Sequence, residues 1–409
     1  MAESKIKFKK CSLLPNEGSG LDEEYNVLAG APLLNYYESI TSPSISATLG
    51  FLDIDQVISR KGIFGGEYID IIIQIDGFDD FKLTQKKHNL FCNAVRDLVT
   101  TENKQFATLD FISVESIINE TARVNQRFTG NVTETVKKLL KGKKGIETKK
   151  NLDSDRASNA YSFVGNLKRP FDTIQWLCSK TQSSKDGYGF LFFETLDGYV
   201  FRSIENLLDE NAVEYKKSEK VEGNNDDLRI LENNLNQTND IGMGCRMGMY
   251  ANKTIYINID NANQKTVDFR IESLKLKKPP KLPKGLEKNP TRLMLRVLDK
   301  GALQKGSQKK KLQKENELAI YQSKSYARNN LIFSQSMSVS IPFNPTLRAG
   351  QMMNLRFPLR KGEDQETTTY GEESDDDVSG KYLISELSHD ISNNQAHTQL
   401  TLIRDVFTA

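Results

Sequence analysis

Short runs of alternating apolar and polar residues dominate the first hundred positions and predict β-strands. The densest run is 68–75, which supplies five isoleucines and a tyrosine, the β-branched and aromatic residues that strands favour. Glycine-containing turns separate the runs, and a last strand is expected at 106–112. Residues 40–112 therefore predict a meander or a small barrel.

The hydrophobic period changes to that of a helix after Ser113. Asn131 and Glu134 have the spacing of a capping box, and an apolar stripe follows them, so we expect a helix that ends at Gly142. The basic stretch 137–150 and the polar connector after it are expected to form a solvated linker. Contact of this stretch with an acidic protein surface or with DNA is the alternative.

A second helix and a hairpin are expected next. Pro170 opens an apolar helical pattern over 170–180. An Asp-Gly turn then separates the aromatic runs 189–194 and 199–204, a strong hairpin signal. Strand character returns at 241–250 and at 254–259, where we expect a second sheet to begin.

The segment 263–329 interrupts the strands and reads as an insertion or an extended arm. It holds four of the chain's 11 prolines and a run of three lysines at 309–311, before a short helix expected at 316–329. Residues 363–377 carry eight acidic side chains and read as a solvated hairpin loop; the alternative, a cation site, lacks the calcium-loop spacing. The last strands are expected at 331–341, 351–357, 380–387 and 398–404.

Composition indicates a folded, soluble protein with no obvious ligand. The 409 residues include 20 Phe and 14 Tyr, which supply large apolar side chains for a core. The net charge is only +2, whereas a nucleic-acid-binding protein usually has a clear excess of basic residues. No apolar stretch reaches the length of a signal peptide or of a membrane span of about 18 residues. The four cysteines are far apart and form no C-x-x-C pair, which argues against zinc and disulfides and fits a reduced compartment.

Candidate catalytic residues are scarce. The dipeptide His389-Asp390 resembles part of a metal phosphohydrolase site, but the further ligands of such a site are missing. We expect His88 to lie at the surface, and His389 and His397 to lie beside a hairpin turn at 393–394. These positions give no metal site.

The remaining motifs give no catalytic or cofactor site either. The glycines at 242, 244 and 248 are spaced one residue too far for a dinucleotide fingerprint. The carboxylates Glu194 and Asp197 belong to the expected hairpin turn, and no phosphate loop, nucleophile elbow or H-E-x-x-H motif occurs. We therefore expect no enzyme, no metal and no cofactor.

Three stretches, taken in order, resemble the baseplate central hub proteins of contractile-tailed bacteriophages of the T-even and cyanophage type. They are 110–140, 170–207, and 341–350 followed by 380–389. In such hubs a Leu-Arg-Ala-Gly turn joins two barrel strands, because its glycine permits a backbone shape that a side chain would oppose. The resemblance assigns this structural turn to Leu347, Arg348 and Gly350.

The resemblance implies a mainly β fold with α+β insertions. It would contain two tail-tube-like β-barrel domains, a mixed helical and hairpin domain, and an extended insertion. The expected limits are 1–115 for the first barrel with its N-terminal extension, 116–215 for the mixed α/β domain, 216–262 and 330–409 for the discontinuous second barrel, and 263–329 for the insertion.

The function implied by the resemblance is structural. Three copies would form a ring of six similar barrels that adapts a six-fold tail tube to a three-fold spike and leaves a channel for DNA ejection. The implied partners are two further copies of the chain, the trimeric tail spike, tail-tube and tube-initiator proteins, the tape-measure protein, baseplate wedge proteins and passing DNA, with no membrane. The protein would be assembled in the host cytoplasm into the virion baseplate.

Two other classes stay open at this point. One is a binding or regulatory enzyme, whose site the sequence does not reveal. The other is a nucleic-acid-binding protein that uses the lysine-rich segments 137–150 and 275–288, although neither contains interleaved aromatic residues that would stack on bases.

Overall fold

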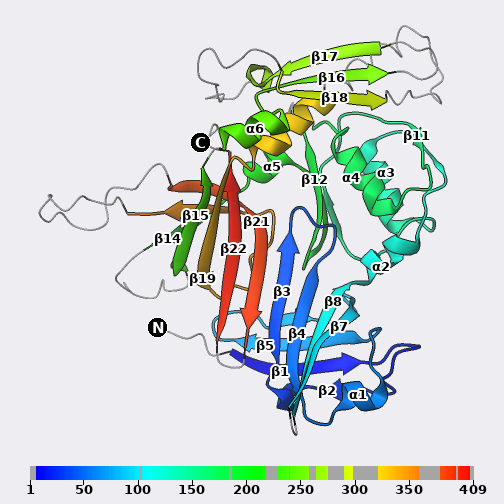
Figure 1. Ribbon diagram of the computed structural model, residues 1–409, viewed down its shortest axis with the longest axis vertical. Helices are drawn as coiled ribbons and strands as arrows, with labels where there is room; N and C mark the ends of the chain where they lie inside the picture. The colour runs from blue at the N-terminus through cyan, green and yellow to red at the C-terminus, as the bar shows by residue number, and fades with distance from the viewer. Residues whose placement is uncertain are drawn as a thin grey trace, which may run out of the picture.

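The computed structural model describes most of the chain and confirms a mainly β architecture with mixed insertions (Figure 1). The described residues are 6–101, 104–183, 187–217, 228–238, 240–257, 264–274, 290–297, 321–358, 378–392 and 395–405. The expected acidic loop at 363–377, the lysine run at 309–311 and the turn at 393–394 lie outside them.

The N-terminal strands form one half of a 14-stranded sheet. The expected strand at 68–75 is β5, whose isoleucines at 69, 71, 73 and 75 are buried, and the expected strand at 106–112 lies within β8. The elements of this half are β1 (Ile6–Leu14), β2 (Tyr25–Asn26), a 3-10 helix (Leu28–Gly30), β3 (Leu33–Ser39), β4 (Ser46–Asp53), α1 (Val57–Lys61), β5 (Tyr68–Ile75), β6 (Phe81–Leu83), β7 (Leu90–Thr101) and β8 (Lys104–Ser113).

The C-terminal strands form the other half, and all four strands expected there are present. They are β14 (Val213–Lys216), β15 (Glu232–Thr238), β19 (Gln335–Pro342), β20 (Met352–Arg356), β21 (Gly380–Ile391) and β22 (Ala396–Arg404). The two halves meet where β21 pairs with β3, from Glu386 opposite Ser39 to Ile391 opposite Leu34. They share one sheet and one apolar core.

Helices and a hairpin between the two halves form a mixed α/β region with its own core. The expected helix at 170–180 and the expected hairpin are confirmed as α4, β12 and β13. The elements are α2 (Val114–Thr121), β9 (Arg127–Phe128), α3 (Val132–Lys141), β10 (Leu152–Ser154), β11 (Phe163–Val164), α4 (Pro170–Cys178), β12 (Phe190–Thr195), β13 (Gly198–Ser203) and α5 (Ile204–Leu208).

Helix α3 ends before Gly142, as expected, but its N-terminal cap is simpler than the sequence suggested. The side chain of Asn131 accepts a hydrogen bond from the backbone N–H of Thr133, two residues into the helix. Glu134 pairs instead with Lys137 at 3.1 Å, so the reciprocal half of a capping box is not formed.

The expectation of a solvated linker at 137–150 is wrong. Ile146 is buried, and its N–H donates to the carbonyl of Leu139, so the chain folds back beneath α3. The polar connector that follows contains β10, which pairs in parallel with β13. The burial of Ile146, together with the backbone hydrogen bonds of Ile146 and Thr148 to the end of α3, holds this segment on the mixed region.

The strand expected at 241–250 is also wrong, because residues Ile241–Met247 form helix α6. The Asp240 side chain accepts from the N–H of Met243 at the start of this helix, and Gly248 closes its end in the left-handed conformation with φ of 69°. These two caps determine a seven-residue helix where the apolar pattern alone resembled a strand.

A separate three-stranded sheet follows, in the order β17-β16-β18. Its strands are β16 (Ala251–Ile257), β17 (Gln264–Arg270) and β18 (Arg292–Val297), with a 3-10 turn at Ile271–Leu274. The strand expected at 254–259 therefore pairs with segments of the expected insertion rather than with the C-terminal strands. In the described part of the expected short helix, residues 321–331 are helical.

Candidate functional site

The turn expected from the resemblance lies between β19 and β20, where the C-terminal strands contact the β12–β13 hairpin. Gly350 has φ of 85°, and its N–H donates to the carbonyl of Ile384 at 2.8 Å. A Cβ atom at this glycine would lie 2.6 Å from Cζ of Phe193 in β12. Leu347, in the same turn, is buried in the main core.

The Glu38 carboxylate, from β3, joins three segments at this turn. Its Oε1 atom accepts hydrogen bonds from the N–H of Leu196 at 2.7 Å and from the Tyr36 hydroxyl at 2.8 Å. Its Oε2 atom accepts from the N–H of Ala349 at 2.8 Å. Burial raises the pKa of Glu38 to about 7, while the positive charge of Arg348 and these donors oppose a larger rise.

Arg348 extends the same junction toward the surface. Its Nε donates to Oδ2 of Asp197 at 2.8 Å, and its Nη1 donates to the carbonyls of Pro345 and Leu347, both at 2.7 Å. Asp197 also lies 3.9 Å from the Lys87 ammonium. The guanidinium therefore links the turn with the β12–β13 hairpin.

A second buried cluster joins the mixed region to the end of β8. The Lys150 ammonium lies 2.6 Å from Glu194 and 2.8 Å from Glu115, and all three side chains are almost completely buried. The Ser113 hydroxyl donates to Glu194 at 2.6 Å. Burial raises the pKa of Glu194, and the Lys150 charge opposes that rise. The prediction of a turn role for Glu194 missed this buried ion pair.

Two of the three histidines are buried where the sequence predicted surface or loop positions. His88 is 3% exposed, and its Nδ1 accepts from the N–H of Thr84 within a tight turn. His389 is fully buried because β21 continues to Ile391, which places its ring 4.9 Å from that of Phe343. Burial lowers the pKa of His389 to about 3, so its imidazole is neutral in the core.

The residues that the structure describes can be compared with the requirements of a metal site and of a membrane-spanning helix. Those residues contain no group of three or more His, Cys, Asp or Glu side chains that could hold a metal ion. All four cysteines are free thiols. No helix in the described ranges has both the length and the apolar character needed to cross a membrane.

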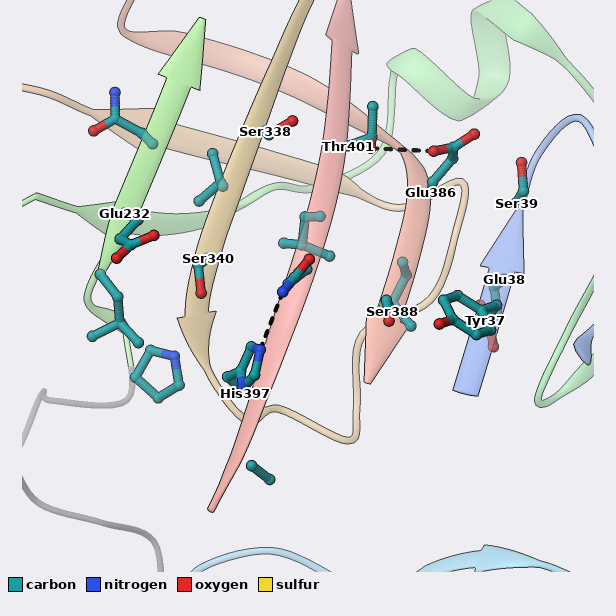
Figure 2. Close-up of a pocket in the computed structure, with 18 of the residues that line it drawn as sticks. Tyr37, Glu38, Ser39, Glu232, Ser338, Ser340, Glu386, Ser388, His397 and Thr401 are labelled. Atoms are coloured by element: carbon teal, nitrogen blue, oxygen red, sulfur yellow. Dashed lines mark hydrogen bonds between the residues drawn. The ribbon is translucent and has the colours of Figure 1, made fainter. Parts of the chain in front are cut away.

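A broad polar groove runs over the outer face of β15, β19, β22, β21 and β3 (Figure 2). Its volume is about 1240 Å³. Hydroxyl and amide side chains dominate the lining, with Thr401 donating to Glu386 at 3.2 Å and Gln399 bonded to His397 at 3.1 Å. The hydroxyl-bearing residues are Tyr37, Ser39, Ser42, Ser44, Ser46, Ser338, Ser340, Ser388 and Thr401.

The groove is poor in positive charge. The chain has 56 Lys and Arg residues, yet among the described residues the groove includes Arg229 and no lysine. The acids Asp76, Glu232 and Glu386 line it as exposed side chains, and His397 lies 3.2 Å from Asp390. Such a surface is hydrated and does not attract phosphates strongly.

Comparison with known proteins identifies a fold. No model of a known protein family matches the sequence, and no curated protein matches it. Two solved structures match it almost end to end. A tail protein from Neisseria meningitidis MC58 has a TM-score of 0.52 and 11% identity, covering 98% of both chains. The 43 kDa tail protein of prophage MuSo2 from Shewanella oneidensis has a TM-score of 0.54 and 8% identity, covering 98% of this chain and 99% of its own. This chain has the fold of these two tail proteins.

Of the site residues that sequence reasoning missed, Glu38 had a readable signal. Leu34, Tyr36 and Glu38 alternate along one strand, so the carboxylate faces the same core as its two predecessors. A carboxylate on an apolar strand face indicates a buried acid with dedicated donors. Lys150 had no such signal, because its two carboxylate partners lie 35 and 44 residues away in the chain.

Proposed function

We propose that this protein is the central hub of a phage-type tail baseplate. Three copies would form a ring whose repeated strand groups match a six-fold tail tube above and a three-fold spike below. The observation that carries this proposal is the shared fold with two tail proteins over 98% of the chain. The order of the three stretches that resemble such hubs supports it independently.

We infer that the polar groove faces the central channel. A channel wall has to stay hydrated and release DNA quickly, and each contact between a basic side chain and a phosphate slows passage. The groove lining offers hydroxyls, amides and a slight excess of acids. DNA would pass this surface without specific binding.

The turn at 347–350 would hold the ring subunit rigid beside this channel. Glu38 and Arg348 connect the strand groups with the β12–β13 hairpin through hydrogen bonds of 2.7–2.8 Å. The partners of such a hub are the trimeric spike, tail-tube and tube-initiator proteins, the tape-measure protein and the surrounding wedge proteins. The role is structural, in the baseplate of the virion after assembly in the host cytoplasm.

The mass of the purified chain in solution tests this proposal. Light scattering is measured with and without the adjacent spike protein of the same source. A mass of three copies, alone or on the spike, is expected. A monomer under both conditions, with no complex, would refute the ring. Tight retention of duplex DNA by that monomer at physiological salt would favour a nucleic-acid-binding role instead.

A further inference from the structure

A rigid surface of positive charge covers the end of α3 and the turn after it. Two acids, Glu134 and Glu147, lie on the same surface, so its six lysines leave a net charge of about four. Among the described residues, Lys137 is the one lysine of the six that forms an ion pair. We call this the lysine surface; its exposed lysines are Lys137, Lys138, Lys141, Lys143, Lys144 and Lys149.

The backbone beneath the lysine surface is fixed. Three backbone N–H groups donate to backbone carbonyls of α3 or of the turn after it, at 2.8–3.0 Å. The pairs are Gly145 to Gly142, Ile146 to Leu139 and Thr148 to Leu140. Ile146 is 2% exposed, and the Thr148 hydroxyl donates to a buried carboxylate. A surface with so much uncompensated charge on a fixed backbone is suited to an anionic partner, because little conformational entropy is lost on binding.

The chain itself contains a segment of opposite charge. Residues 363–377 carry eight carboxylates and no lysine or arginine. The segment connects β20 with β21, and β20 pairs with β14. In Figure 1, β14 lies at the left side of the molecule and α3 at the right. The acidic segment and the lysine surface are therefore attached at opposite sides of one copy.

We propose that the acidic segment of one copy binds the lysine surface of the next copy in the ring. A head-to-tail ring brings opposite sides of neighbouring copies together, which gives every segment a partner surface. The 19 residues from 359 to 377 can reach about 30 Å from their attachment as a doubled chain. This inference rests on the proposed ring and adds the contact that sets the direction of its assembly.

A peptide-binding experiment tests this contact without requiring a ring. The probe is a fluorescein-labelled peptide of residues 360–378, titrated by anisotropy with the full chain carrying D375N, D376N and D377N. We expect K143E/K144E/K149E in that chain to weaken binding by about tenfold or more at low salt, and less at high salt. The matched control K7E/K82E/K86E changes three exposed lysines elsewhere and should leave binding unchanged. Equal binding to all of these chains would overturn the proposal, as would tighter binding of a labelled DNA duplex to the lysine surface.

Assembly gives the second readout. Light scattering should show that K143E/K144E/K149E and D375K/D376K/D377K each lower the mass of the complex, and that one chain with both changes recovers it. Peptide binding by a chain that never trimerises would support the contact and refute the ring. A wild-type ring that neither reversal affects would overturn the contact and leave the hub proposal standing.

Discussion

Replacement of Gly350 by alanine probes the junction between the C-terminal strands and the β12–β13 hairpin. The new methyl group would lie 2.6 Å from Cζ and 3.1 Å from Cε2 of Phe193. Phe193 is fully buried, so its ring cannot rotate away into solvent. The turn would have to move instead, and with it the Ala349 N–H that donates to Glu38.

The expected cost has two parts. A non-glycine residue in the left-handed region costs about 1–2 kcal/mol. An extra methyl group in a filled core costs about 1–3 kcal/mol more. Gly350→Ala should therefore lower the free energy of unfolding by about 2–5 kcal/mol. Gly77→Ala is the matched control, because Gly77 has φ of 86° with no atom within 4 Å of the added carbon, and it should cost only about 1–2 kcal/mol.

Urea unfolding followed by fluorescence and circular dichroism measures both variants. The difference between them isolates the overlap with Phe193, because the backbone conformation is nearly the same at the two glycines. Phe193→Leu removes the outer ring atoms, so adding Gly350→Ala to it should cost little more than the control. An equal loss of stability for Gly350→Ala and Gly77→Ala would refute the reasoning. An undiminished cost in the Phe193→Leu background would place the overlap elsewhere.

Two further predictions concern buried charges. Lys150→Met leaves two buried carboxylates without their ammonium partner and should cost about 3–5 kcal/mol, whereas Lys137→Met, at an exposed pair, should cost less than about 1 kcal/mol in the same unfolding assay. The pKa of Glu38 is raised from 4.5 to about 7 in the folded protein, so the free energy of unfolding should fall by about 3 kcal/mol as pH rises through that window, and stay flat above it. Urea titrations from pH 4 to pH 8 should show this fall in the wild type, relative to Glu38→Gln; parallel pH profiles would contradict it.

Local elements could be predicted from the sequence where the hydrophobic periodicity agrees with the turn or capping residues that bound the element. The strand at 68–75, the helix from Pro170 and the Asp-Gly hairpin all carry their signals within a few residues. Helix α6 was missed because its glycines and alternating apolar residues resemble a strand. Its capping residues, Asp240 and Gly248, were the competing signal.

The buried polar clusters depend on contacts that no local pattern encodes. Glu38 accepts a hydrogen bond from Ala349, which is 311 residues away in the sequence, and Lys150 pairs with Glu194, which is 44 residues away. A lysine in a basic stretch has the same local sequence whether it is solvated or buried. Its role follows only once Ile146 anchors the fold-back that carries it inward.

The pairing of β3 with β21 determines how the two strand groups can move. Six consecutive residue pairs, from Glu386 with Ser39 to Ile391 with Leu34, make the groups one sheet, and the core beneath them is shared. Rotation of one group against the other would break this ladder and expose that core, so the groups should unfold together. Hydrogen exchange should therefore show the same opening free energy for the paired amides of β3 and β21. Exchange of β21 through a separate, faster opening while β3 stays protected would mean that the two groups are independent units joined only at an edge.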